Sequence, residues 1–167
     1  MKTLSLLING EPVPFYLANL NYSVEQLAHT FSCNIPPMKI TEPLPVEFRL
    51  NNNPVLTGQI DQVDCSTASG SSDISISGRS KSANMIDSRI TMDALYEQNV
   101  ETLLRSLAKP FGLSVKSLVT SMPVIPEFQI NAESPVENVA QIIREQGFML
   151  IERNGVLTIE NTAHATI

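Results

Sequence analysis

Two Asn-Gly pairs, each placed between short apolar runs, constrain the fold of this chain more than any other feature. Asn9-Gly10 separates Leu4–Ile8 from Val13–Leu17, and Asn154-Gly155 divides the apolar segment 148–160. Asn and Gly readily adopt the positive φ angles of a type I′ turn, whose twist matches that of two antiparallel strands. The sequence therefore predicts one β-hairpin near the start of the chain and one over residues 148–160.

Further short strands are predicted in the first part of the chain, which shows no helical periodicity. Pro12 and Pro14 cannot donate ladder hydrogen bonds, so the second arm of the first hairpin is expected at a sheet edge or bending out of the sheet. Four more strands are predicted over Leu27–Cys33, Val46–Leu50, Val55–Val63 and Asp73–Ser77. Short strands with turns about every ten residues predict an antiparallel β-barrel-like domain over residues 1–90.

Helical patterns begin after residue 90. An apolar stripe at i, i+3, i+4, i+7 and i+8 predicts a helix over residues 99–109. Lys109 suits the end of that helix, and Pro110 with Gly112 terminates it. The members of the stripe are Val100, Leu103, Leu104, Leu107 and Ala108.

A second helix is predicted over residues 135–146. Ser134, Pro135 and Glu137 match an N-cap serine, a first-turn proline and the glutamate of a capping box. Gly147 stands where a helix commonly ends on glycine. With strands predicted at Leu113–Leu118 and Glu127–Ile130, residues 91–167 form a two-helix α+β module. The whole chain is therefore expected to be of mixed β and α+β class.

Composition excludes several classes of protein. The net charge is −6 and the pI is near 4.9, so nucleic-acid phosphates would be repelled on average. No apolar run approaches the ~18 residues that span a bilayer, so membrane insertion is not expected. The apolar run at Leu4–Ile8 is too short for a secretory signal. Cys33 and Cys65 lack metal-binding spacing and are expected to be buried free thiols in a reducing compartment.

No catalytic, cofactor or metal site is predicted. His29 and Cys33 lie four residues apart, which on a strand separates them by over ~12 Å, and no second ligand pair completes a zinc site. The second histidine, His164, is in the C-terminal tail. Asp61 and Asp64 could act as paired carboxylates, but on a strand they are expected on opposite faces as solvated side chains.

The segment from Asp73 to Ser88 is the most specific stretch of the sequence. A predicted strand runs into Gly78-Arg79-Ser80-Lys81-Ser82, which lacks the clustered glycines of a nucleotide-binding loop, and Ala83 and Asp87 follow at fixed offsets. This segment resembles the signature of baseplate hub proteins of Mu-like contractile-tailed phages. Gly78, Arg79, Ser80, Ala83 and Asp87 match that signature, whereas Asn84 replaces an acidic residue.

The resemblance implies an architectural function. Such hubs are similar to the spike base of type VI secretion systems, in which three copies form a ring that joins the tail tube to the central spike. It implies a homotrimer in the virion tail baseplate, made in the bacterial host cytoplasm, that contacts tube and spike proteins. These hubs usually continue with a second barrel-like domain, so the resemblance also implies that this chain is an N-terminal fragment or, alternatively, a shortened relative whose ring is completed differently. For Arg79 and Asp87, a local ion pair is favoured over an intersubunit contact.

Two other classes of function stay open on the sequence alone. The chain could be a non-enzymatic β-domain that binds a peptide or a cell-surface glycan. A glycan site usually has clustered exposed aromatic residues, and aromatic residues make up only 5% of this chain. It could also be a cell-wall hydrolase of a phage tail, for which Asp61 and Asp64 would be the acidic residues. The low histidine and cysteine counts argue against an enzyme.

Overall fold

The computed structural model describes residues 2–68 and 71–161, and its chain divides into two compact units. Unit 1 comprises residues 1–23 and 28–81, and unit 2 comprises residues 24–27 and 82–167. The division along the chain therefore falls between Lys81 and Ser82, whereas composition placed it near residue 90. No helix in the described part of the chain is long and apolar enough to span a membrane.

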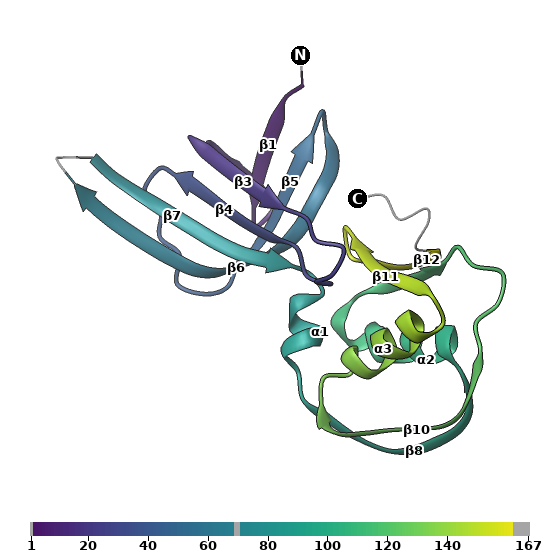
Figure 1. Ribbon diagram of the computed structural model, residues 1–167. Helices are drawn as coiled ribbons and strands as arrows, with labels where there is room; N and C mark the ends of the chain where they lie inside the picture. Colours follow the sequence, from purple (N-terminus) through teal and green to yellow (C-terminus); the bar gives the residue numbers. More distant parts are fainter. Residues whose placement is uncertain (1, 69–70, 162–167) are drawn as a thin grey trace. The chain divides into compact units, whose positions relative to one another are not determined.

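Unit 1 is a curled antiparallel sheet of seven strands, in the order β2-β1-β5-β6-β7-β4-β3 (Figure 1). Every strand pair in it is antiparallel, and β2 and β3 form its two edges. The antiparallel, barrel-like fold predicted for the first part of the chain is thus confirmed, with an open sheet. The strands are β1 (Leu4–Ile8), β2 (Glu11–Val13), β3 (Leu17–Asn21), β4 (Thr30–Ile35), β5 (Pro45–Leu50), β6 (Asn53–Ala68) and β7 (Ser71–Ser80).

The core of unit 1 lies on one face of this sheet. Burial alternates along β4 and β7, as the period of a strand with one buried face requires. Ile74 and Ile76, whose alternation predicted such a strand, are both buried. The rings of Phe31 and Phe48 lie 5.4 Å apart in this core. Its buried members are Leu6, Ile8, Phe31, Cys33, Ile35, Val46, Phe48, Leu56, Ile60, Ile74 and Ile76.

The first hairpin forms at Asn9-Gly10, as predicted, but its second arm is shorter than expected. Asn9 and Gly10 have φ angles of 52° and 82°, and β2 ends at Val13. Pro14 has no N–H to continue the ladder. The Tyr16 N–H donates to the Asn34 carbonyl at 2.9 Å, which directs the chain to the opposite edge of the sheet. Val13–Leu17 is therefore not one strand.

Up to residue 161, unit 2 contains three α-helices, one short 3-10 helix and two small sheets (Figure 1). Strands β8 and β10 form an antiparallel pair, and the other sheet has the order β11-β12-β9, with β9 parallel to β12. No strand was predicted at β8. The elements are α1 (Ala83–Asp87), β8 (Ile90–Asn99), α2 (Val100–Ala108), η1 (Lys109–Phe111), β9 (Ser114–Ser117), β10 (Val124–Glu133), α3 (Glu137–Glu145), β11 (Phe148–Arg153) and β12 (Val156–Asn161).

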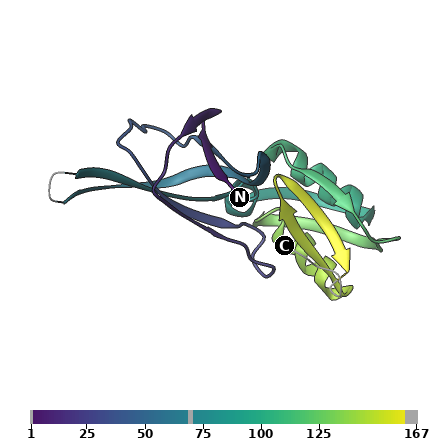
Figure 2. The ribbon, with the colours of Figure 1, turned by 90° about the horizontal axis from the view of Figure 1, so that it is seen from above.

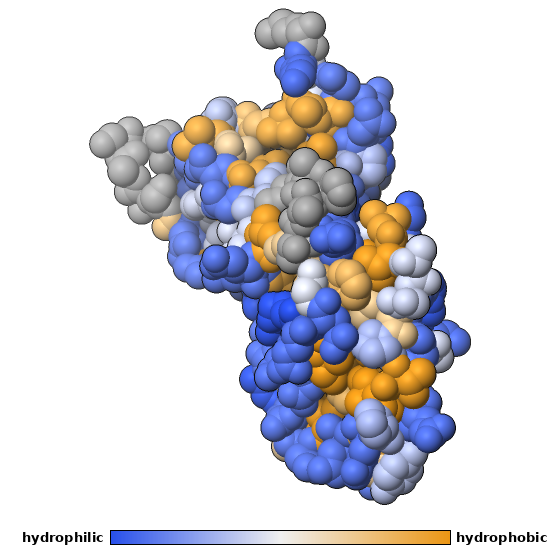
Figure 3. All heavy atoms as spheres, turned by 45° about the vertical axis from the view of Figure 1, so that its right-hand side comes forward, coloured by the Kyte–Doolittle hydropathy of each residue, from blue (hydrophilic) through white to orange (hydrophobic). Residues whose placement is uncertain are grey.

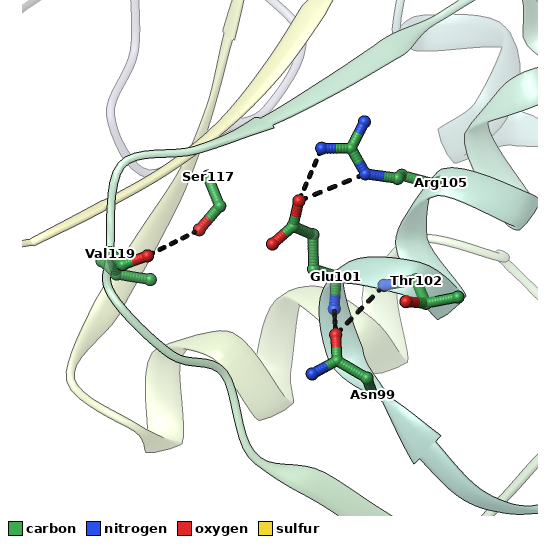
Figure 4. Close-up of polar contacts among 6 residues, drawn as sticks. All are labelled: Asn99, Glu101, Thr102, Arg105, Ser117 and Val119. Carbon is green, nitrogen blue, oxygen red and sulfur yellow. Dashed lines mark hydrogen bonds and ion pairs between the residues drawn. The ribbon is translucent and has the colours of Figure 1, made fainter.

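Helix α2 matches the helix predicted over residues 99–109. The side-chain oxygen of Asn99 accepts hydrogen bonds from the N–H groups of Glu101 and Thr102, at 3.0 and 3.3 Å (Figure 4). Glu101 and Arg105 form an i,i+4 ion pair at 2.5 Å. All five residues of the predicted apolar stripe are buried. Gly112, with φ 65°, then ends the short 3-10 turn η1 that follows.

The capping box predicted for the second helix is wrong. Helix α3 begins at Glu137 after Val136, which makes no side-chain capping hydrogen bond. The Ser134 hydroxyl is fully buried and instead donates to the carbonyl of Met85 at 3.4 Å. A tertiary contact has therefore taken the side chain that the local pattern assigned to the helix. Gly147, with φ 78°, ends the helix as predicted.

Strands β11 and β12 form the second predicted hairpin. Arg153 lies opposite Val156 across a turn in which Asn154 and Gly155 have φ angles of 51° and 81°. This hairpin, α2 and α3 enclose a single apolar core. Its buried members are Met85, Val100, Leu103, Leu104, Leu107, Ala108, Leu113, Val115, Met122, Phe128, Ile130, Val136, Val139, Ala140, Ile143, Leu150, Leu157 and Ile159.

Candidate interface motif

The five motif residues lie at the end of β7 and in α1. Gly78, Arg79 and Ser80 are the last three residues of β7 and belong to unit 1. Ala83 and Asp87 are the first and last residues of α1 and belong to unit 2. The motif therefore spans the division between the two units, and each half has its own environment.

Gly78 is required by a close approach of its neighbours. A Cβ atom at this position would lie 1.9 Å from the carbonyl oxygen of Gln59 and 2.8 Å from Cζ of Phe31. Real Cβ atoms essentially never approach other heavy atoms within 3.0 Å. Any larger residue at Gly78 would have to displace the backbone of β6 and an aromatic ring of the core.

Ser80 joins the end of β7 to the residue that precedes β4. Its hydroxyl oxygen accepts a hydrogen bond from the His29 N–H at 2.9 Å, and its own N–H donates to the His29 carbonyl at 2.8 Å. Ser80 is buried, so water cannot replace these bonds readily. The motif serine therefore has a structural role that its position in the sequence did not reveal.

His29 is buried and held by neighbours within unit 1. Its Nδ1 accepts a hydrogen bond from the Ser23 N–H at 3.3 Å, and its ring lies 4.9 Å from the ring of Tyr22. His29 is therefore a buried, hydrogen-bonded residue. No group of three or more potential metal ligands occurs among residues 2–68 and 71–161, and His164 lies outside the described residues.

Arg79 pairs with a carboxylate on the neighbouring strand. Its Nε lies 2.8 Å from Oδ2 of Asp61, and Gln59 donates to Oδ1 of the same carboxylate at 3.2 Å. Both ionic side chains are only partly exposed. Asp64 has a different neighbour, because its Oδ2 accepts a hydrogen bond from Gln62 at 2.8 Å. The two aspartates thus have separate partners, and the ion pair expected between Arg79 and Asp87 stays a prediction.

In unit 2 the motif begins with a buried turn. Ala83 is buried in α1, and the N–H of the preceding Ser82 donates to Oε2 of Glu152 at 3.0 Å. The other oxygen of this buried carboxylate, Oε1, accepts a hydrogen bond from Gly155 N–H at 3.3 Å. Glu152 therefore joins the start of α1 to the β11–β12 turn. Sequence reasoning missed this role, because the bond links residues 70 positions apart.

The two cysteines differ in their surroundings. Cys33 is buried in the core of unit 1, and burial raises the pKa of its thiol to about 11. Cys65 is exposed on β6, so the expectation of two buried thiols is wrong for this residue. Cys65 lies in the part of β6 that, among the described strands, pairs with β7 alone.

Several solved structures share this arrangement of strands and helices. No family model and no curated protein matches the sequence. The 43 kDa tail protein of prophage MuSo2 from Shewanella oneidensis is 22% identical and superposes with a TM-score of 0.84, covering 96% of this chain and 53% of that one. The chain has the fold of prophage tail proteins.

Two further solved structures share this tail-protein fold. A tail protein from Neisseria meningitidis MC58 is 18% identical with a TM-score of 0.82, and the match covers 95% of this chain and 50% of that one. An E. coli component of the type VI secretion system, described as structurally similar to bacteriophage T4 tail proteins, is 12% identical with a TM-score of 0.72, covering 97% and 50%. The chain thus spans about half the length of these proteins. The fold expected from the resemblance is confirmed.

Proposed function

We propose that this chain is a structural component of a phage or prophage tail baseplate hub. The observation that carries the proposal is the superposition on the MuSo2 tail protein, with a TM-score of 0.84 over 96% of this chain. Because it covers 96% of this chain, the match includes both units. The likeness to the type VI secretion component supports the same reading, because that protein is itself described as similar to T4 tail proteins.

In this proposal three copies form a ring that connects the tail tube to the central spike of a contractile tail. Apolar side chains reach the surface in several patches of the face shown in Figure 3. Charged residues make up only 17% of the chain, and interface centres are depleted in charge. Both properties support extensive protein contacts. The exposed large apolar residues are Tyr16, Leu17, Tyr22, Tyr96, Leu118 and Val124.

The motif residues have two roles in this proposal. Gly78 and Ser80 fix the end of β7 within unit 1. Gly78 allows the backbone of β6 to approach closely, and Ser80 is hydrogen-bonded to His29. Arg79 and Asp87 either pair locally or meet a neighbouring subunit. The side chain of Arg79 is partly exposed, and its Nε lies against Asp61. Both arrangements would suit the planar donor group of arginine.

The proposed role is not enzymatic. Its location would be the virion tail baseplate, after synthesis in the host cytoplasm. The two candidate acidic residues have separate partners, since Asp61 contacts Arg79 and Asp64 accepts a hydrogen bond from Gln62, which supports a non-enzymatic role. A purified sample incubated with peptidoglycan should therefore release no soluble fragments. Turnover abolished by Asp61→Ala or Asp64→Ala would overturn this part of the proposal.

The mass in solution tests the ring directly. We expect light scattering over a hundredfold concentration range to show a trimer, or a monomer that converts to a trimer as concentration rises. Arg79→Ala should weaken association if Arg79 meets a neighbouring subunit, whereas Arg105→Ala, which removes an exposed ion pair on α2, should leave the mass unchanged. A strict monomer at every concentration would contradict ring formation by these residues and favour a peptide- or glycan-binding module.

A further inference from the structure

The β6–β7 hairpin extends beyond β5 and β4, the two strands that flank it in the sheet. The register between β5 and β6 ends at Gln59, and the register between β4 and β7 ends at Ile74. Beyond these points the two strands pair only with each other, as far as Ala68 and Ser71. Figures 1 and 2 both show this part as a narrow two-stranded ribbon. We call Asp61–Ala68 and Ser71–Asp73 the arm.

The β6 side of the arm is an unprotected strand edge. Within the described residues, Asp61–Ala68 pairs with β7 and with no other strand. Eight residues in strand conformation span about 26 Å, at roughly 3.3 Å for each residue. Natural edge strands are usually protected by lysine, proline or bulges. The arm contains neither lysine nor proline, and its one register irregularity lies at the root, between Ile60 and Gln62.

A two-stranded ribbon is by itself only marginally stable in water. A third strand added along the free edge of β6 would satisfy the unpaired backbone groups and lengthen the sheet. Adding an extended segment to an exposed edge is a common mode of peptide recognition, in which backbone hydrogen bonds give affinity and side chains give specificity. The arm has the length and the free edge that this mode requires.

The charges of the arm define the chemistry of such a segment. Residues 50–78 include three aspartates and no lysine, arginine or histidine. Asp61 is compensated by Arg79, but Asp64 and Asp73 have no cationic partner in the described part of the chain. Asp64 pairs with Ser75, and Ser75 lies two residues after Asp73 on β7. Paired residues share a face of the sheet, as do residues two positions apart on one strand, so both carboxylates are on one face of the arm. Asp64 is exposed and stands on the free edge strand itself.

We propose that the free edge of Asp61–Ala68 binds an extended strand of another protein that carries lysine or arginine at alternate positions. Backbone pairing holds the segment against β6, and its cationic side chains meet the carboxylate of Asp64. Asp73 lies one strand further away, at about 10 Å from the added strand, where salt screens its attraction. A second copy of this chain fits less well, because none of its edge strands in the described residues carries lysine or arginine at alternate positions.

The experiment uses the full chain and three synthetic octapeptides. The first alternates lysine with threonine, the second replaces lysine by glutamate, and the third is the lysine peptide with N-methylated backbone amides. Titrations are followed by amide NMR at a fixed protein concentration. The lysine peptide should shift the amide signals of Asp61–Ala68 and slow their hydrogen exchange, and the other two peptides should not.

Charge variants locate the contact. Asp64→Asn should weaken binding of the lysine peptide about three- to fivefold, as expected for the loss of one exposed ion pair. Asp73→Asn should change it by less than about twofold. Asp93→Asn removes the same charge from an exposed site in unit 2 and should leave binding unchanged. An unchanged amide spectrum outside the arm would show that the variants remain folded.

Three results would overturn the proposal. One is the absence of any change at Asp61–Ala68 with the lysine peptide at millimolar concentration. Another is equal binding of the glutamate or N-methylated peptide, which would exclude charge recognition or backbone pairing. The third is equal weakening by Asp64→Asn and Asp93→Asn, which would indicate an effect of net charge alone. None of these results depends on the ring, which is tested by light scattering without peptide.

Discussion

Ser80 and His29 form two hydrogen bonds with each other, one from each backbone N–H, although 51 residues separate them in the sequence. One bond uses the Ser80 hydroxyl and the other the His29 carbonyl. They fix the end of β7 beside the start of β4, at the point where the chain leaves unit 1. The motif serine, the last residue of β7, therefore also forms a tertiary contact.

Ser80→Ala should destabilise the protein by about 1–3 kcal/mol, because it leaves the buried His29 N–H without its acceptor. Urea unfolding followed by far-ultraviolet circular dichroism measures this loss. Ser106→Ala is a suitable control, since this exposed hydroxyl donates to the Thr102 carbonyl on the surface of α2. Similar midpoints for Ser80→Ala and the wild type would contradict the structural role of Ser80.

Gly78→Ala should be more damaging than a glycine substitution at a turn. The added Cβ would collide with the Gln59 carbonyl and the Phe31 ring. We expect a loss of several kcal/mol, at the upper end of about 1–3 kcal/mol for overpacking or beyond it. Gly147→Ala has open space but a φ of 78°, so it should cost only about 1–2 kcal/mol. Thermal unfolding of both variants compares the two effects, and the reverse order would refute the packing argument.

Asn99→Ala should remove the N-cap of α2 and destabilise unit 2 by about 0.5–2 kcal/mol. The reason is that the Asn99 side chain accepts from two N–H groups of the first helical turn. Asn99→Asp should recover part of the stability, because aspartate is an equally good cap but cannot donate to the Met122 carbonyl, as Asn99 Nδ2 does at 3.3 Å. Hydrogen exchange of the first amides of α2 is the local measurement. Equal exchange in Asn99→Ala and wild type would show that this cap contributes nothing.

The two thiols should differ in their reaction with a thiol reagent such as Ellman's reagent. At pH 8, exposed Cys65 should react at once and buried Cys33 only after denaturation, giving one rapid equivalent per chain. Cys65→Ser should abolish the rapid reaction. Two rapid equivalents from the native protein would contradict the burial of Cys33.

The raised pKa of Cys33 also predicts a loss of stability at alkaline pH. Burial raises this pKa from its usual value of 9.0 to about 11. Between these values the unfolded chain releases the thiol proton while the folded chain keeps it, so the free energy of unfolding falls as pH rises. The urea concentration at the unfolding midpoint should therefore fall as the pH rises from about 9 to about 11. Cys33→Ala should show a smaller decline over the same range.

Local signals in the sequence predicted the two Asn-Gly turns and helices α2 and α3, but not the short helix α1. Asn-Gly pairs determine a turn through their own φ angles, and the stripe from Val100 to Ala108 determines which helix face is buried. Strand β8 was missed because its alternation breaks in the middle. Glu97 has a φ of 50°, and β8 pairs irregularly with β10. An irregular strand does not keep the period of two that identifies a strand in a sequence.

Long-range contacts account for what the sequence could not predict. Ser134 had every local feature of an N-cap, yet its hydroxyl binds Met85, 49 residues away. The motif residues were singled out by resemblance, but the partners Phe31, His29 and Asp61 could not be assigned to them. Those partners depend on the strand order of the sheet, which brings β4 and β6 to either side of β7.

Four residues from the first part of the chain, Val24–Leu27, belong to unit 2, where Leu27 packs against the apolar core. During synthesis the ribosome releases these residues long before Ser82, so the second unit cannot be completed from one continuous stretch of polypeptide. Exchange of this unit between genes that encode the same fold, at the Lys81–Ser82 junction, would leave the four residues of the original parent behind. Recombinant chimaeras should therefore be stable only when Val24–Leu27 is exchanged together with everything after Lys81.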